Sequence, residues 1–341
     1  MSRVAMWLHV LAAVACLVFA QVSAHRVEEK KGGPSSVVLL ETAADSIKTL
    51  AYRWDKGSTT STFSGAKGER RVVVAVDREV PPRKEQPDTK KKLSDDVDTP
   101  PPAIVDVVRE QGTIPGNKAV IAAAAALEPL KTKRTLGTVD ADKLLAMGLA
   151  PPLRFLDVTT ASGKQLHLEI GEQSYGAQGR YVRVVGSADV HLIDQAVVNG
   201  LEGGLDALLE KRVLLAELEQ IRGFGVVVGE RKGSFVHVDK DQPSTRYFAA
   251  KDEPTIKREA VGKLLTTLRN VRGTGLASAD VVAGAVAVRF AVDVDGTPQV
   301  ITIFERADGT GHLARIGEYT WLLTATAGKE LVDDATTALS E

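Results

Sequence analysis

The sequence offers no cysteine framework for disulfides or metals. Cys16 is the only cysteine among the 341 residues, and it lies in an apolar segment near the N terminus. No intramolecular disulfide can form, and thiol catalysis and cysteine-ligated metal sites are excluded. Stability must therefore come from the burial of apolar side chains, which a chain of this length can supply.

Aromatic residues are scarce, and neither sign of charge dominates. Aromatic residues make up 5% of the chain, and 43 basic against 44 acidic residues give a formal net charge of −1. Few aromatic rings offer few stacking platforms for bases, and a balanced charge gives no long-range attraction to phosphate backbones or acidic membranes. We therefore expect no nucleic-acid partner. The 44% hydrophobic content indicates a globular protein.

The motifs of common catalytic and cofactor sites are also missing. The sequence holds no Gly-x-Ser-x-Gly elbow, no helix with paired histidines and no phosphate-binding loop ending in Gly-Lys-Ser/Thr. Gly223, Gly225 and Gly229 have the wrong spacing for a dinucleotide loop, and Asp293–Gly296 lacks the later ligands of a calcium loop. The sequence predicts no catalytic, cofactor-binding or metal-binding residues, and we expect no enzyme activity.

Six histidines are present, and no two have the spacing of metal ligands. His167, His191 and His237 lie in or beside predicted strands, where we expect structural or solvent-facing roles. A cluster of these three with carboxylates in one cleft would favour an enzyme instead.

The N terminus has the pattern of an export segment. A basic head at Met1–Arg3 precedes the apolar run Val4–Ala20, and small residues follow at 22–24. This pattern predicts that residues 1–24 form a signal peptide or an N-terminal membrane anchor, and lipidation at Cys16 is a third alternative. In each case the rest of the chain lies outside the cytoplasm, in the periplasm or cell envelope.

Two stretches are too polar to contribute to a core. Residues 25–36 are charged and rich in helix breakers, which predicts a tether. Residues 81–102 contain six prolines and clustered Lys and Asp, which predicts a disordered insertion or, with Lys90–Lys92, a docking arm.

The remaining sequence indicates a duplication. Three pairs of segments correspond in order and pattern: 119–130 with 260–271, Arg154–Ile170 with Arg289–Phe304, and Gly179–Val184 with Gly311–Ile316. Repetition of this length is typical of a duplicated module. It predicts domains at residues 37–211 and 212–341, joined near Glu210–Val213.

Each repeat is predicted to be α+β, with an antiparallel β-sheet backed by α-helices. Asp295-Gly296 and Asp308-Gly309 between alternating apolar runs predict hairpins. Asn117 has the residue type of a helix N-cap. Asp252 with Pro254 predicts the start of a helix that continues through Val271, and residues 194–209 predict a closing helix.

The segment Leu145–Pro152, the hairpin Leu153–Ile170 and the strands Gly179–Val184 and Val190–Ile193 together resemble a bacterial envelope family, the domain of unknown function 4340 family. The resemblance covers residues 37–214 well and the second repeat more loosely. Met147 stands where the family has an aromatic residue, and the second repeat lacks the Gly-Leu-x-x-Pro segment. The resemblance implies tandem extracytoplasmic repeats and an association with gliding-type ABC transporter components, and it carries over no catalytic residues.

These observations predict a non-catalytic extracytoplasmic scaffold or accessory subunit of a cell-envelope complex, with a membrane protein complex such as an ABC-type transporter as its partner. The alternative is a ligand-binding protein that holds a carbohydrate or peptide in a cleft between the repeats. The aromatic residues best able to line such a cleft are Tyr175, Tyr181, Tyr247, Tyr319 and Trp321.

Overall fold

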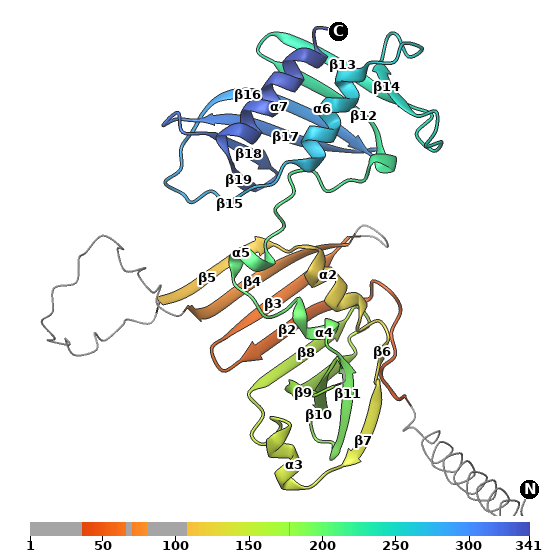
Figure 1. The fold of residues 1–341 in the computed structure, drawn as a ribbon, viewed down its shortest axis with the longest axis vertical. Coiled ribbons are helices and arrows are strands. Elements are labelled where there is room, and N and C mark those ends of the chain that lie inside the picture. The colour runs from red at the N-terminus through yellow and green to blue at the C-terminus, as the bar shows by residue number, and fades with distance from the viewer. Residues whose placement is uncertain (1–35, 66–69, 81–107, 177) are drawn as a thin grey trace, which may run out of the picture. The chain divides into compact units, whose positions relative to one another are not determined.

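The computed structural model describes residues 36–65, 70–80, 108–176 and 178–341. The chain divides into two compact units, Met1–Leu208 and Leu209–Glu341, here called the N-terminal and C-terminal units. The predicted export segment, the tether up to residue 35 and the insertion at 81–102 lie outside the described residues. Each unit is built around one antiparallel sheet (Figure 1).

The sheet of the N-terminal unit has nine strands in the order β5-β4-β3-β2-β8-β9-β10-β11-β7. Its strands are β2 (Ile47–Trp54), β3 (Gly57–Ser64), β4 (Arg71–Val80), β5 (Val108–Pro115), β7 (Arg134–Thr138), β8 (Arg154–Thr160), β9 (Gln165–Gln173), β10 (Gly179–Val184) and β11 (Asp189–Asp194). A separate pair joins β1 (Val38–Leu40) to β6 (Leu130–Lys131). The helices are short: α2 (Lys118–Ala125), α3 (Ala141–Ala146), α4 (Ala196–Asn199) and α5 (Leu205–Leu208).

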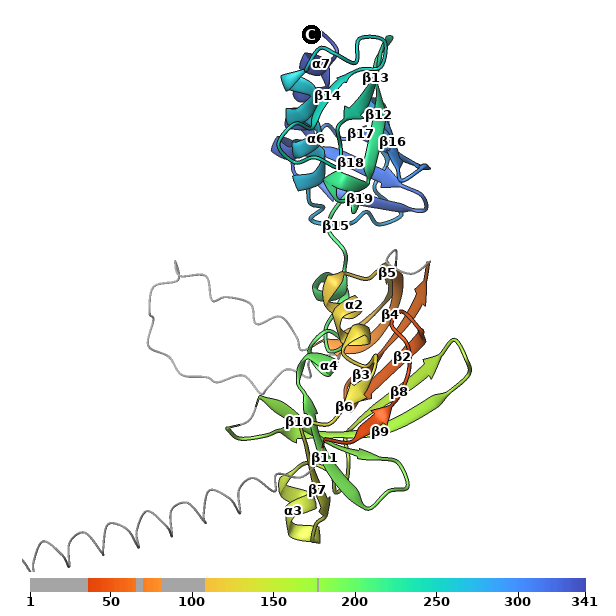
Figure 2. The same ribbon diagram turned by 90° about the vertical axis from the view of Figure 1, so that its right-hand side faces the viewer.

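One face of this sheet is covered, and alternating side chains supply its core. In β4, Val72, Val74 and Val76 are buried while the residues between them are exposed, as the two-residue period of a strand requires. Helices α2 and α4 lie on the buried face (Figure 2). We call the opposite face of each sheet its outer face.

The sheet of the C-terminal unit has eight strands in the order β14-β13-β12-β16-β17-β18-β19-β15. Its strands are β12 (Ile221–Val228), β13 (Arg231–Val238), β14 (Tyr247–Ala250), β15 (Gly275–Leu276), β16 (Ala283–Val294), β17 (Thr297–Arg306), β18 (His312–Ile316) and β19 (Tyr319–Leu323). The helices are the 3-10 helix η1 (Leu218–Gln220), α6 (Glu259–Asn270) and α7 (Ala325–Ala338).

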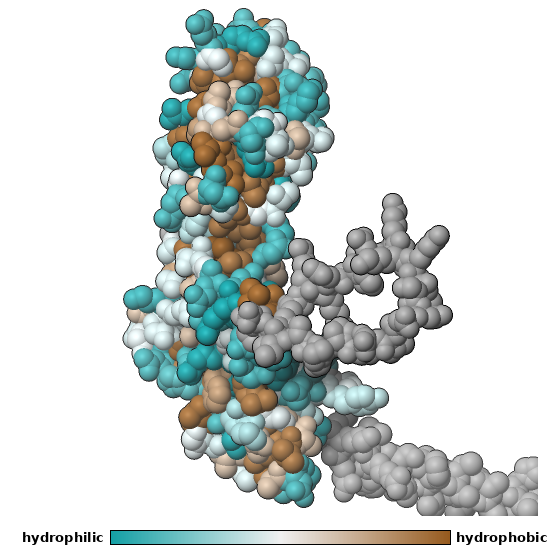
Figure 3. All heavy atoms as spheres, turned by 90° about the vertical axis from the view of Figure 1, so that its left-hand side faces the viewer, coloured by the Kyte–Doolittle hydropathy of each residue, from teal (hydrophilic) through white to brown (hydrophobic). Residues whose placement is uncertain are grey.

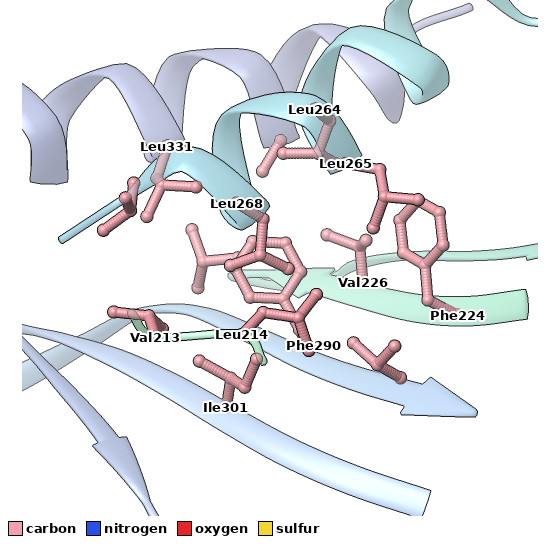
Figure 4. Close-up of a cluster of buried hydrophobic side chains, with 14 of the residues drawn as sticks. Val213, Leu214, Phe224, Val226, Leu264, Leu265, Leu268, Phe290, Ile301 and Leu331 are labelled. Atoms are coloured by element: carbon pink, nitrogen blue, oxygen red, sulfur yellow. The ribbon is translucent and has the colours of Figure 1, made fainter. Parts of the chain in front are cut away.

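The core of the C-terminal unit lies between its sheet and its two longer helices. Leu264, Leu265 and Leu268 project from α6 at helical spacing onto Phe290 and Ile301 of the sheet (Figure 4). All five are at most 1% exposed. Burial of large apolar side chains at this density is the main stabilising contribution to the unit.

The expected α+β class is wrong, because the protein is mostly β. Among the described residues 49% lie in strands and 19% in helices. The closing helix expected at 194–209 is two single turns, α4 and α5. Gly200 separates them at a point where a Cβ would lie 2.3 Å from the carbonyl oxygen of Ala119. Only glycine fits there, and glycine interrupts a helix.

Other local predictions had mixed outcomes. Asn117 caps α2 by accepting from the backbone N–H groups of Ala119 and Val120, as expected. Asp295 and Gly296 adopt positive φ angles of 48° and 90° in the β16–β17 hairpin, which confirms the turn predicted there. The helix expected from Asp252 instead begins at Glu259.

The two sheets share one strand order. When β5 is set aside, the two sheets correspond strand by strand. From one edge to the other, the pairs are β4 with β14, β3 with β13, β2 with β12, β8 with β16, β9 with β17, β10 with β18, β11 with β19 and β7 with β15. A register shift also occurs at the same place in both, after Ile47 in β2 and after Ile221 in β12. This common register makes Tyr52 the counterpart of Val226.

The correspondence expected for the β8–β9 and β16–β17 hairpins was one residue off. Arg53 pairs with Phe155 and its counterpart Val227 pairs with Arg289, so Phe155 and not Arg154 corresponds to Arg289. A slip of one residue exchanges the two faces of a strand. Arg154 therefore lies on the covered face while Arg289 lies on the outer face.

Candidate functional site

The most polar part of the covered face in the N-terminal unit is the Tyr52 cluster, formed by Tyr52, Arg154, Glu172, Arg180 and Glu202. The hydroxyl of Tyr52, a fully buried residue, donates to Glu202 Oε1. Arg154 Nε lies 3.3 Å from the same oxygen, and its Nη1 lies 2.9 Å from Glu172 Oε1. Strands β2, β8, β9 and β10 thus place a phenol, two guanidinium groups and one carboxylate together, and Glu202, between α4 and α5, adds the second carboxylate.

The cluster holds its tyrosine as a neutral donor. Burial raises the pKa of Tyr52 far above its usual value, and the hydrogen bond to the Glu202 carboxylate raises it further. Beside it, the buried Thr59 hydroxyl donates to Leu201 O at 2.9 Å. These contacts anchor the segment between α4 and α5 to the sheet, which is a structural role.

A second buried assembly of the N-terminal unit is also structural. Arg70 and Glu128 form a bidentate pair at 2.8 and 3.0 Å, with side chains 6% and 2% exposed. Glu128 accepts from the backbone N–H of Ile47, and Arg70 donates to the carbonyl of Ile47. The Arg70 guanidinium lies 4.4 Å from the Phe63 ring centroid. Asp45 Oδ1 lies 3.5 Å from Arg70 Nη1, and Arg70 Nε is buried with no hydrogen-bond partner among the described residues. Buried pairs of this kind fix local geometry.

The C-terminal unit has an open hollow of about 420 Å³, the His237 hollow, lined by Arg222, His237, Asp239, Lys240, Asp241 and Gln242. His237 Nδ1 lies 2.9 Å from Ile221 O and must donate to it, and the ring stacks on Phe248. Burial lowers the pKa of His237, and the charges of Arg246 and Lys240 add to that effect. The neutral ring leaves Nε2 as a buried acceptor with no partner among the described residues.

The three histidines named from the sequence are not brought together. On the outer face His167 Nδ1 lies 2.8 Å from Asp157 Oδ1, and its side chain is 52% exposed. His191 is buried on the opposite face of the same sheet and contacts Thr135 Oγ1 at 3.1 Å. His237 belongs to the other unit. The described residues contain no group of three or more His, Cys, Asp or Glu able to hold a metal ion.

The five aromatic residues named for a ligand cleft have separate environments. Tyr175 is fully exposed after β9, and Tyr181 is half-buried in β10. In the C-terminal unit, the Tyr247 hydroxyl donates to Pro254 O, and Trp321, 4% exposed, donates from Nε1 to Glu210 O at 2.9 Å. Tyr319 lies half-buried against Trp321. Trp321 is therefore part of a core and is not available to a ligand.

The outer face of the N-terminal unit carries charges that neutralise one another. Asp157 pairs with both Arg53 and His167, and Glu169 pairs with Arg183 at 2.6 Å. At the edge, Arg109 pairs with Asp77, and hydrogen bonding to that guanidinium lowers the pKa of Asp77. The Arg53–Asp157 and Arg109–Asp77 pairs are largely exposed and contribute little to stability, whereas Glu169 and Arg183 are only 15% and 21% exposed.

One protein-family model matches the chain. The model of a domain of unknown function, DUF4340, matches residues 114–285, half of the chain. The chain belongs to the DUF4340 family. The DUF4340 match begins at the end of β5 and runs into β16, whereas the resemblance seen in the sequence covers residues 37–214.

No curated protein and no solved structure matches the chain significantly. Within the described ranges, no helix is long and apolar enough to cross a bilayer.

Proposed function

We propose that this DUF4340 protein is a non-catalytic extracytoplasmic scaffold, an accessory subunit of a cell-envelope complex. One observation carries the proposal. In each unit buried polar groups, such as the Tyr52 hydroxyl and Trp321 Nε1, are used in contacts that hold the fold together, while much of the outer face of the sheet is exposed. An antiparallel sheet with one open face presents a rigid, broad surface that suits protein recognition.

The surface of the C-terminal unit includes exposed hydrophobic residues that fit this role. Figure 3 shows the C-terminal unit from the side, where hydrophobic residues gather between hydrophilic ones. Large exposed hydrophobic residues of this unit include Val282, Val286 and Val300. Apolar centres with polar rims are typical of protein interfaces.

The site of action and the partner are part of the same proposal. The basic and apolar pattern of residues 1–24 supports export or anchoring, and the family resemblance supports a membrane protein complex of the ABC-transporter type as partner. We further infer that the two units are tandem copies, because they share strand order and the register shift in β2 and β12.

The proposal is tested by affinity purification of the full chain from crosslinked envelopes. We expect a discrete membrane complex to be recovered with the native chain. A matched variant with charge reversals on both outer faces, Arg53→Glu with Arg289→Glu, should recover less of it. Recovery of no membrane complex with the native chain would count against the proposal.

A ligand-binding function is the second candidate, and the His237 hollow favours it. Its buried Nε2 acceptor, with Arg222 and Lys240 as donors, suits a polyol whose hydroxyls both donate and accept. Saturation-transfer NMR against a panel of sugars tests this function. Binding that His237→Phe abolishes would support it, and no binding by the native chain would reject it.

A further inference from the structure

Three basic residues line up on the outer face of the C-terminal sheet. Backbone pairing places Lys232, Val227, Arg289, Thr302 and Arg315 in one row across β13, β12, β16, β17 and β18. Lys232, Arg289 and Arg315 are all exposed, and we call them the basic row. Because they occupy alternate strands, successive members stand about 10 Å apart.

The basic row has no neutralising partner in the part of the chain that the structure describes. Lys232 and Arg289 form no side-chain ion pair there, and Arg315 contacts only the Thr320 hydroxyl and the ring of Phe304, 4.7 Å from its guanidinium. The carboxylate on the same face of β16, Asp293, accepts from the N–H of Gly296 in its own turn. Three neighbouring cations are thus left for an external anion.

The matching row of the N-terminal sheet is built differently. There Ser58, Arg53, Phe155, Glu169 and Arg183 occupy the five equivalent positions. Glu169 pairs with Arg183, and Arg53 pairs with Asp157 of the adjacent row. The unpaired positive charge of the basic row is therefore specific to the C-terminal unit and does not follow from the strand order that both units have.

Small apolar residues border the basic row. The adjacent row contains Gly225, Ala291 and Val300, the last 40% exposed. A Cβ at Gly225 would meet no atom closer than 3.7 Å, so the surface above it is open. Val286, 54% exposed, and Phe304 lie on the other side of the row. A flat apolar surface crossed by arginines is suited to a protein partner.

The chemistry favours an acidic protein over an anionic membrane. The chain has a net charge of −1 and lacks the long-range field that concentrates proteins at acidic bilayers. Short-range pairing is different, since each guanidinium can bind a carboxylate in a bidentate way. In an α-helix, residues seven apart lie about 10.5 Å apart on one face, which matches the spacing of the basic row.

We propose that the basic row binds an acidic helical segment of a partner protein, with carboxylates repeated every seven residues. This inference rests on the proposed scaffold function and specifies the chemical nature of the segment through which the partner would bind. The small residues Val227 and Thr302 between the cations let the helix approach the sheet, and the apolar borders contact its flanks.

The test uses the full chain and a fluorescent alanine-rich helical peptide with three Glu placed seven residues apart. We expect saturable, salt-sensitive binding. Arg289→Glu with Arg315→Glu should weaken it about tenfold or more. The control Arg71→Glu, an exposed arginine on the outer face of the N-terminal unit, should change it less than about twofold. A peptide of the same composition with three consecutive Glu should bind more weakly.

Three results would overturn the proposal: no peptide binding, binding unchanged by the paired reversal in folded protein, or equal binding of both peptides. Binding to phosphatidylglycerol vesicles without binding to the peptide would assign the basic row to lipid instead. If the peptide binds but the affinity purification from envelopes recovers no membrane complex, the basic row is an acidic-helix site and the scaffold function is rejected. The two failures are therefore distinguishable.

Discussion

The two units have separate sheets with a common strand order, and they differ in the side chains that these sheets carry. At the position that follows the same register shift, the N-terminal unit has Tyr52, hydrogen-bonded to Glu202, and the C-terminal unit has the buried Val226. On the outer faces the relation is reversed, because the N-terminal unit pairs its charges and the C-terminal unit leaves the basic row unpaired. The same strand order therefore carries a buried tyrosine hydroxyl and paired surface charges in one unit, and a buried valine and an unpaired basic row in the other.

The largest expected effect tests whether the C-terminal unit depends on its apolar core. Phe290→Ala removes a fully buried ring between β16 and α6 and should lower the free energy of unfolding by about 3–5 kcal/mol. Hydrogen exchange during urea titration, followed separately in each unit, should show the loss in the C-terminal unit. Equal loss of protection in both units would show that they do not unfold independently.

The next effect should be confined to the N-terminal unit. Glu128→Gln leaves the Arg70 guanidinium, 6% exposed, with only the Asp45 carboxylate, 3.5 Å away and 30% exposed, and should destabilise that unit by about 3 kcal/mol. Replacing both partners, with Arg70→Met and Glu128→Met, should recover part of the loss, because no buried charge then remains. A double variant less stable than Glu128→Gln would contradict this account of the pair.

The polar interior of the N-terminal unit should make it sensitive to alkali. The folded-state pKa of Tyr52 is raised, so its contribution to stability is present below the unfolded value of about 10 and is lost as pH rises above it. Tyr52→Phe should cost about 1–3 kcal/mol at neutral pH and reduce the fall in stability above about pH 10. Denaturation midpoints from pH 8 to 11 would measure both.

The smallest effect concerns the buried histidine of the C-terminal unit. The lowered pKa of His237 means that its contribution is present above about pH 6.5 and is lost as pH falls below that value. His237→Phe, which installs the residue of its counterpart Phe63, should flatten the pH dependence of that unit between about pH 7 and 5. The N-terminal unit, with His191 intact, is the internal control.

Local features of the fold could be predicted because they depend on neighbouring residues. The Asn117 cap and the Asp295-Gly296 turn need only a few consecutive residues, and both were predicted. The start of α6 was misplaced because the residue types at Asp252 and Pro254 fit a helix start whether or not the chain there is helical.

Long-range features left no comparable signal. Tyr52 and Glu202 are 150 residues apart, and Arg70 and Glu128 are 58 apart. No spacing rule connects such pairs. The Arg-Phe dipeptides at 154 and 289 look equivalent in sequence, yet strand register puts their arginines on opposite faces. The basic row was missed for the same reason, since its members come from three strands that only the sheet brings into line.

The most direct test of the scaffold account is photocrosslinking in intact cells from two single positions, Val300 on the outer face of the C-terminal unit and Tyr175 in the turn after β9. A photoreactive residue at Val300, beside the basic row, should give a discrete adduct with an envelope protein. The adduct should disappear when Arg289 and Arg315 are reversed, and the Tyr175 position should give none. No adduct from Val300, or one that survives the reversal unchanged, would contradict the claim that this surface performs the protein's function.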